Sequence, residues 1–251
     1  MELPLEIDTS MENTRPAQVI AAIIPVYDEA ERVGQVLSVL REVACLKEII
    51  VVDDGSTDGT LEEVNQCAAL DARIRVLSHA NNQGKGQAVY KGKSATRATY
   101  LLMLDGDLVG LNPQHVHDLI QPVIDGDADM TMGLFRGGRF NTDLSQWLFP
   151  WLTGQRCLRT NLFQFVSIDA AAGYGLETAL TMVSRQYGWR CQHVALTGVY
   201  HPPSEFHRGV WTGIKVRAKM NTQILRAFIL AIHWKRIIRQ LRLRIQFGKL
   251  H

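Results

Sequence analysis

Acidic residues are absent from the last part of this 251-residue chain. Residues 206–251 hold 11 of the 27 lysines and arginines and none of the 25 aspartates and glutamates. The preceding 205 residues therefore carry 16 basic and 25 acidic side chains. A cationic, acid-free segment favours an anionic surface as its partner. Because no nucleic-acid-binding motif and no aromatic-basic interleaving accompany it, we predict no nucleic-acid partner.

Cysteines and long apolar runs are also scarce. The four cysteines are widely spaced and form no C-x-x-C pair, which is typical of reduced packing residues and favours a cytoplasmic location. The sequence contains no 18-residue apolar span, so we predict that the chain does not cross a membrane. The first 16 residues lack the apolar run of a signal peptide, and we expect a disordered leader there.

The two common phosphate-binding motifs are missing as well. The glycine-containing stretch NQGKGQAV, residues 82–89, matches neither G-x-x-x-x-G-K-[ST] nor G-x-G-x-x-G. A nucleotide could then be held through its base and ribose by acidic side chains at strand ends. Its diphosphate would in that case be held by a metal ion.

Apolar stretches and helical patterns alternate through residue 134. Buried strands are predicted at residues 18–26, 48–52, 73–78, 100–104 and 128–134, with amphipathic helices between them. Asn112 and Pro113 predict the start of one helix, and Thr60 with Glu63 predicts a capping box for another. Short connections in this alternation indicate an α/β fold, a mostly parallel sheet with helices on both faces.

The second half of the chain has a different character. Residues 136–165 predict an irregular, partly helical segment, followed by a helix at residues 175–187 and a strand at 191–196. From residue 209 onward the pattern is helical. We therefore expect one folded domain over residues 17–205, with two parts of different character at residues 17–134 and 135–205. A basic helical tail over residues 206–251 would follow.

Carboxylates gather where the predicted parallel strands end. Ligands of such sheets bind at the carboxyl ends of the strands. The acidic residues predicted there are Asp28, Glu29, Asp53, Asp54, Asp105 and Asp107. Asp105-Gly106-Asp107, directly after a buried strand, is a metal-site pattern, because Mg²⁺ and Mn²⁺ prefer oxygen ligands. Ordinary turn and cap chemistry is the alternative for these acidic turns, including Asp58.

Four segments together resemble family 2 glycosyltransferases with the GT-A fold, which is Rossmann-like. They are IIPVYDEAERV, IIVVDDGSTDGT, NQGKGQAVYKG and LLMLDGDL, and they occur in the family's order across residues 20–108. The resemblance implies a transferase that uses a nucleoside-diphosphate sugar and Mg²⁺ or Mn²⁺. It also implies that residues 17–205 are the GT-A catalytic domain, with a nucleotide-sugar half at 17–134 and an acceptor half at 135–205. It covers well over a third of the chain.

The resemblance also implies roles for individual residues. The residues implied to line the base, the ribose and the sugar-nucleotide are Pro25, Tyr27, Glu29, Asp54, Gly84 and Lys85. Asp54 would meet the base edge, and Asp105 and Asp107 would bind the ribose and the metal that bridges the diphosphate. For Lys85, the alternative is a solvated start of a helix.

Two later segments are similar to polyprenyl-phosphate sugar transferases and to glucosyl-3-phosphoglycerate synthases. They are GYGLE at residues 173–177 and GVYH at residues 198–201. This similarity implies that His201 is a third metal ligand, and imidazole suits Mn²⁺ better than Mg²⁺. It also implies that Glu177 faces the donor sugar or the acceptor. The alternatives are a loop histidine with satisfied hydrogen bonds and a helix-start acid favoured by the dipole.

The segment FPWLTGQRCLR, residues 149–159, resembles the family stretch that precedes the acceptor site. The arginines implied to meet an acceptor phosphate are Arg136, Arg139, Arg156 and Arg159. His207 and Arg208 could also contact phosphate. The alternative is a solvated charged face for the four arginines and a solvated loop for His207 and Arg208.

The tail carries an apolar stripe beside basic residues. The stripe is Trp234, Ile238, Leu241 and Ile245, and the adjoining basic residues are Lys235, Arg236, Arg239 and Arg242. A basic amphipathic helix of this kind is typical of an interfacial membrane anchor. An ordinary surface helix that packs one stripe on the core is the alternative.

Together these features predict a metal-dependent transferase that moves a sugar from a UDP-sugar, rather than a GDP-sugar, to a lipid or polyprenyl phosphate. We expect inversion of the anomeric centre and a peripheral position at the inner face of the membrane. One alternative is a retaining transferase that acts on a small soluble acid such as 3-phosphoglycerate. Another is a non-catalytic nucleotide-sugar-binding or scaffold protein.

Overall fold

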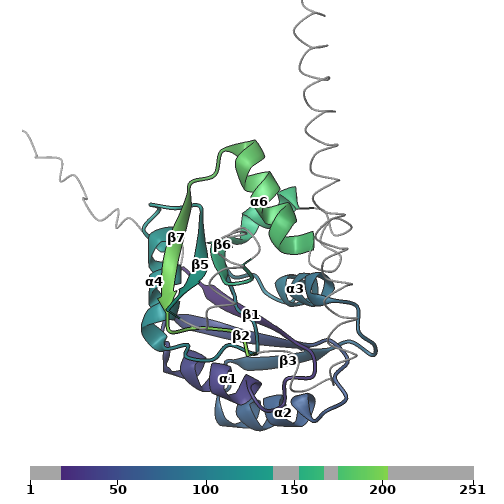
Figure 1. The fold of residues 1–251 in the computed structure, drawn as a ribbon. Helices are drawn as coiled ribbons and strands as arrows, with labels where there is room; N and C mark the ends of the chain where they lie inside the picture. Colours follow the sequence, from purple (N-terminus) through teal and green to yellow (C-terminus); the bar gives the residue numbers. More distant parts are fainter. Residues whose placement is uncertain (1–17, 138–152, 167–174, 203–251) are drawn as a thin grey trace, which may run out of the picture.

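The computed structural model describes residues 18–137, 153–166 and 175–202 (Figure 1). The predicted leader and the predicted basic tail lie outside the described residues, as do Arg139, His207 and Arg208. Among the described residues, no helix is both long enough and apolar enough to span a bilayer.

In the part of the chain that the structure describes, seven strands form one sheet in the order β3-β2-β1-β4-β6-β5-β7. They are β1 (Ile20–Val26), β2 (Leu46–Asp53), β3 (Ile74–Ser78), β4 (Tyr100–Met103), β5 (Met130–Arg136), β6 (Arg156–Arg159) and β7 (Cys191–Thr197). Of the described strands, only β6 runs antiparallel to its neighbours. The carboxyl ends of the six other strands therefore meet at one edge of the sheet (Figure 1).

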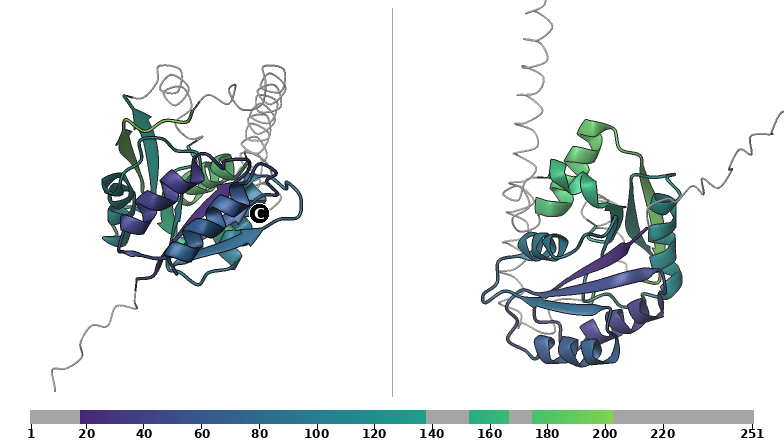
Figure 2. Two further views of the ribbon diagram at one scale, coloured as in Figure 1. Left: turned by 90° about the horizontal axis from the view of Figure 1, so that it is seen from below. Right: turned by 180° about the vertical axis from the view of Figure 1, so that it is seen from behind.

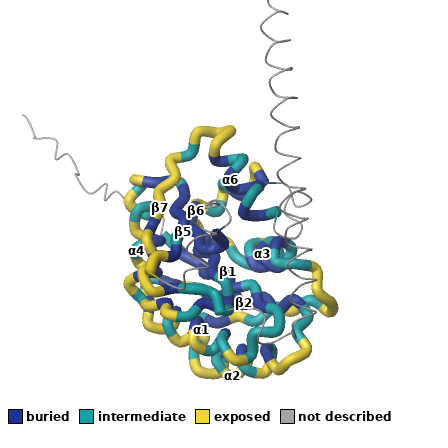
Figure 3. Tube along the Cα trace, viewed as in Figure 1, coloured by how far each residue is buried: buried dark blue, intermediate teal, exposed yellow. Residues whose placement is uncertain are grey.

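Helices cover both faces of this sheet. Side chains of α1 (Val33–Glu42), α2 (Thr60–Leu70) and α4 (Pro113–Ile124) pack in one core cluster, and those of α3 (Lys85–Ser94) and α6 (Gly175–Tyr187) pack in another. Successive residues of β1 alternate between the two faces: Ile20, Ala22 and Ile24 join the first cluster, and Ala21 and Ile23 join the second. Figure 2 shows the two helical layers from behind, and Figure 3 shows the buried central strands. The predicted α/β architecture is confirmed.

The structure differs from the sequence prediction at β6. Residues 136–165 were expected to be irregular and partly helical, but Arg156–Arg159 is a strand between β4 and β5, and a 3₁₀ helix (Thr160–Phe165) follows it. Four residues with an arginine at each end show too little alternation to indicate a strand. Arg156 pairs with Met103 and Arg159 with Tyr100, so β6 starts at the carboxyl edge of β4 and runs away from it.

Helix starts were predicted with mixed success. The α4 start is confirmed, because the Asn112 side chain accepts a hydrogen bond from the His115 N–H at 3.0 Å. The capping box at Thr60 is wrong: Thr60 is already the first residue of α2, and Asp58 accepts from its N–H at 3.0 Å. The Thr60 hydroxyl instead accepts from the Glu29 N–H at 2.7 Å, which fastens the loop after β1 to α2.

Candidate active site

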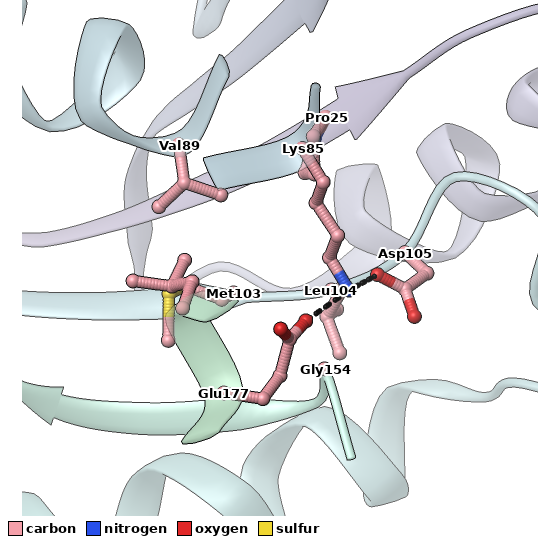
Figure 4. A pocket seen from close by; sticks show the side chains of 9 residues that line it. Pro25, Lys85, Val89, Met103, Leu104, Asp105, Gly154 and Glu177 are labelled. Carbon is pink, nitrogen blue, oxygen red and sulfur yellow. Dashed lines mark ion pairs between the residues drawn. The ribbon is translucent and has the colours of Figure 1, made fainter. Parts of the chain in front are cut away.

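A small hollow lies at the carboxyl edge of the sheet, where β1 and β4 end and β6 begins (Figure 4). It is lined by Pro25, Lys85, Val89, Met103, Leu104, Asp105, Gly154, Leu176 and Glu177. These residues come from β1, α3, α6, β4 with the two residues after it, and the turn before β6. Four of the predicted site residues, Pro25, Lys85, Asp105 and Glu177, are thus brought together here.

Lys85 joins two carboxylates across this hollow. Its Nζ lies 2.6 Å from Asp105 Oδ1 and 2.7 Å from Glu177 Oε1 (Figure 4). Burial lowers the pKa of Lys85, but the two carboxylates outweigh burial and hold the pKa above its ordinary value. The side chain is therefore an ammonium between two acids and not a solvated helix start.

Glu177 is a buried carboxylate in the first turn of α6. It is only 3% exposed, and among the described residues its Oε2 finds no hydrogen-bond donor. A buried carboxylate oxygen without a donor is costly, so a bound molecule that supplies one is favoured at this position. Sugar hydroxyl groups are donors of the required kind.

Asp105, Asp107 and His201 form a cluster beside the hollow. One ligand atom from each side chain lies within 4.8 Å of the other two. His201 Nδ1 is 2.8 Å from Asp107 Oδ1, and His201 Nε2 is 3.5 Å from Asp105 Oδ2. Two carboxylates and one imidazole fit Mn²⁺ and, less closely, Mg²⁺. The three residues come from the turn after β4 and from the segment after β7, so only the fold brings them together.

The charges in this cluster stabilise one another. Burial raises the pKa of Asp107, but His201 outweighs it and lowers that pKa below its usual value. Burial lowers the pKa of His201, but the Asp107 and Asp105 carboxylates outweigh it and raise that pKa. A divalent cation would supply the same kind of positive charge to both carboxylates.

A short antiparallel bridge holds His201 next to Asp107. The Val109 N–H donates to the Tyr200 carbonyl at 3.1 Å, and the Tyr200 N–H donates back to Val109 at 3.1 Å. Gly110, with φ 79°, lies so close to Gly198 that an added Cβ would meet the Gly198 oxygen at 2.3 Å. A side chain at Gly110 would therefore push the His201 segment away from β4.

We expect Gly110→Ala to lower the free energy of unfolding by about 1–3 kcal/mol, because strain at positive φ and a backbone clash add. Gly198→Ala is the matched control: Gly198 also has positive φ (78°), but no atom of the described residues lies within 4 Å of its added Cβ. Urea denaturation of both variants checks this. Equal losses for the two variants would show that the close approach at Gly110 contributes nothing.

The loop after β1 reaches the same edge of the sheet. Pro25 lines the hollow, and Tyr27 and Glu29 follow it. The Glu29 carboxylate lies 2.6 Å from Arg32 Nη1. Asp28, with φ 54°, accepts a hydrogen bond from the Thr57 N–H at 2.9 Å, which locks this loop to the one after β2. Contact of Tyr27 and Glu29 with base and ribose stays a prediction.

Asp54 organises the loop that delivers Lys85. It is 3% exposed, and its carboxylate accepts from the N–H groups of Gln83 (2.9 Å) and Gly84 (2.7 Å). His79 Nδ1 lies 2.7 Å from the same carboxylate. Both oxygens are thus engaged within the protein, and the predicted contact with the base edge stays a prediction. His79 was not identified from the sequence, since a lone histidine after a strand carries no signal of its own.

The structure argues against the predicted acceptor roles of Arg156 and Arg159. Arg156 is 0% exposed and lies in the interior. Arg159 lies beside the Tyr100 ring, with 6.0 Å from its Cζ to the centroid, at the amino end of β4. Because β6 is antiparallel, its three-residue step moves Arg159 about 10 Å from the carboxyl edge. Arg136, at the end of β5, remains exposed near that edge.

Gln155 is a site residue that sequence reasoning missed. Its side-chain amide donates to Asp105 Oδ2 at 3.0 Å, and the residue is 0% exposed. Gly154 beside it has no side chain, and an added Cβ would lie 2.3 Å from Lys85 Nζ. Only the pairing of β6 with β4 places these residues against Asp105, and that pairing was not foreseen.

Comparison with known proteins identifies the class. The profile of "Glycosyl transferase family 2" matches residues 21–174. The chain therefore belongs to glycosyltransferase family 2. The predicted resemblance is confirmed.

Among curated relatives, the chain is 30% identical over 141 residues to a "Glycosyltransferase GlyG" of Streptococcus pneumoniae, which covers 55% of this chain and 45% of that protein. It is 29% identical over 127 residues to a glucosyl-3-phosphoglycerate synthase of Mycolicibacterium paratuberculosis, covering 47% and 37%. An undecaprenyl-phosphate mannosyltransferase of Micrococcus luteus is 27% identical over 204 residues, covering 72% and 83%. The chain thus matches less than half the length of the first two relatives.

Among solved structures, glucosyl-3-phosphoglycerate synthase from Mycobacterium tuberculosis, in complex with Mn²⁺ and UDP-glucose, matches with a TM-score of 0.70. The identity is 22%, and the match covers 85% of this chain and 79% of that one. This likeness shows the GT-A fold.

Proposed function

We propose that this protein is a metal-dependent glycosyltransferase that uses a UDP-sugar as donor and a lipid or polyprenyl phosphate as acceptor. The observation that carries the proposal is the cluster of Asp105, Asp107 and His201 beside the hollow that Lys85 and Glu177 enclose. Intact carboxylates at both positions 105 and 107 favour an enzyme over a non-catalytic scaffold.

The three clustered side chains would hold Mn²⁺ or Mg²⁺, which neutralises charge that grows on the departing nucleoside diphosphate. Lys85 is a second cation at the same place, already ionised and about a quarter exposed (26%). Glu177 would accept a hydrogen bond from a donor-sugar hydroxyl through Oε2. Gln155 would keep Asp105 oriented during this step.

Support for a UDP-sugar comes from a structural relative that holds UDP-glucose with Mn²⁺. Support for a polyprenyl phosphate comes from the sequence match to the undecaprenyl-phosphate mannosyltransferase, which covers 83% of that protein's length. The sequence match to the glucosyl-3-phosphoglycerate synthase of Mycolicibacterium paratuberculosis covers 37% of that protein's length. The acid-free basic segment 206–251 adds attraction to an anionic leaflet, about 1 kcal/mol for each basic residue near the surface. We propose a peripheral position at the membrane on this ground.

The second candidate is a retaining transfer to a small soluble acid. It is supported by the likeness of the fold to glucosyl-3-phosphoglycerate synthase in complex with phosphoglyceric acid. We favour inversion, in which the acceptor attacks in line with the departing diphosphate. An acceptor phosphate is already ionised and needs no general base, unlike an acceptor hydroxyl.

The acceptor is tested by offering both candidates to the purified full chain. A panel of UDP- and GDP-sugars with Mn²⁺ is incubated either with undecaprenyl phosphate in anionic vesicles or with 3-phosphoglycerate. We expect a UDP-sugar to give a glycolipid whose newly formed anomeric bond, read by proton NMR, is inverted. Transfer to 3-phosphoglycerate alone, with retention, would establish the second candidate instead.

A further inference from the structure

Arg156 is the largest side chain that the described interior encloses completely. A guanidinium without access to water is expensive unless its donors are satisfied and its charge is opposed. We infer that Arg156 is a positioning residue, which sets the spacing of Glu177 and Asp105 across the hollow. This inference rests on the proposed function, because it concerns the donor site of that reaction.

The contacts of Arg156 join two parts of the site. Its Nε donates to the Thr153 carbonyl at 2.9 Å, and its Nη2 donates to the Thr181 hydroxyl at 3.1 Å. The Thr181 hydroxyl in turn donates to the Glu177 carbonyl at 2.8 Å. Arg156 therefore ties the turn before β6 to the first two turns of α6.

That turn forms one wall of the hollow. Thr153 is fastened to β5, because its hydroxyl donates to the Gly133 carbonyl at 2.6 Å. Gly154 lies against Lys85 and Asp105 with no room for a Cβ, and Gln155 holds Asp105 at 3.0 Å. The opposite wall is Glu177 on α6. Arg156 is thus the tie between the wall that orients Asp105 and the wall that carries Glu177.

Electrostatic attraction to Glu177 strengthens the link that Arg156 makes between the two walls. Burial lowers the pKa of Arg156 to about 10, and Glu177 is the carboxylate that opposes the shift most. The guanidinium is therefore still charged at neutral pH. Lys85 is shared between Asp105 and Glu177, so Arg156 supplies positive charge behind Glu177 that does not depend on where the Lys85 side chain points.

The test compares Arg156→Met and Arg156→Lys with Arg159→Met in the full chain. Arg159 lies three residues along the same strand, is exposed, and sits at the opposite edge of the sheet, so it is a matched control. Turnover is measured with the nucleotide sugar that the wild type uses fastest, and the Kd of UDP is measured with Mn²⁺. We expect Arg156→Met to lower kcat at least tenfold and leave the UDP Kd within twofold. Arg156→Lys should recover part of the loss.

Thr181→Val leaves Arg156 in place but removes the hydroxyl that accepts from its Nη2 and donates to the Glu177 carbonyl, and it covers the case in which Arg156→Met does not fold. We expect a smaller loss of kcat, again with unchanged UDP affinity. Wild-type kcat in folded Arg156→Met, or in Thr181→Val if Arg156→Met does not fold, would overturn the inference. Equal losses of UDP affinity and kcat would also overturn it, since they indicate a general structural role. A wild type that turns over no nucleotide sugar would instead overturn the proposed function, and the inference with it.

Discussion

Replacing Asp107 with alanine should lower sugar transfer by about a thousandfold or more, because the proposed metal ion, which would stabilise the leaving diphosphate, would lose a carboxylate ligand. Asp107 lies 2.8 Å from His201 and belongs to a cluster in which the ligand atoms are within 4.8 Å of one another. The variant would also leave the His201 imidazole without its nearest carboxylate. Initial rates at saturating Mn²⁺ check the prediction.

Asp127→Asn is the control for this experiment. Asp127 is exposed and precedes β5, so it lies at the edge of the sheet away from the site. We expect its rate to equal that of the wild type. A rate for Asp107→Ala within tenfold of the wild type would contradict the metal site.

Replacing Lys85 with methionine should lower turnover by about a hundredfold. This is the effect typical of losing one protein group that stabilises a developing anion. The ammonium lies between Asp105 and Glu177, at 2.6 and 2.7 Å, on the first turn of α3. Its removal leaves two carboxylates facing each other, one of them 3% exposed. These two carboxylates would repel each other, and both would repel the diphosphate. The measurement is kcat and KM for the nucleotide sugar.

Lys93→Met, eight residues later on the same helix, is the matched control. We expect unchanged kcat and KM for it. If Lys85→Met retained wild-type turnover, the lysine would be only a structural partner of the two acids.

Much of the fold follows from local patterns. In β1 both alternating sets of side chains are apolar, because both faces of the strand are covered by helices, and this doubled pattern is visible in the sequence. Asn112 and Pro113 mark the start of α4 because they satisfy backbone requirements within the first turn of that helix. Most features whose causes lie within a few residues were predicted, although the capping box at Thr60 was not found.

Features that depend on distant segments gave no local signal, and where they were predicted, as for His201 beside Asp107, the prediction came from the resemblance. β6 is a strand because β4 and β5 on its two sides supply hydrogen-bond partners, and its own four residues give no periodic signal. The expected acceptor roles of Arg156 and Arg159 came from the resemblance of residues 149–159 to a family stretch, and the pairing of β6 with β4 and β5 places neither side chain at the site. The misassignment of β6 concealed Gln155, whose contact with Asp105 joins residues 50 positions apart.

The acidic turns show how one pattern serves two purposes. Asp58 holds the start of α2, and Asp54 holds the loop before Lys85, as the alternative of turn chemistry predicted. Asp105 and Asp107, in contrast, face Lys85 and His201 across the site. Composition alone could not separate these cases, because the separation depends on which elements lie opposite each carboxylate.

The central claim, a metal site that holds a nucleoside diphosphate, is tested most directly by calorimetry of UDP on the wild type with and without Mn²⁺. We predict that UDP binds at least tenfold more tightly with Mn²⁺ present, and that Asp107→Ala abolishes this gain. Equal UDP affinity in the presence of Mn²⁺ and in the presence of a chelator, for the wild type as for the variant, would contradict the account.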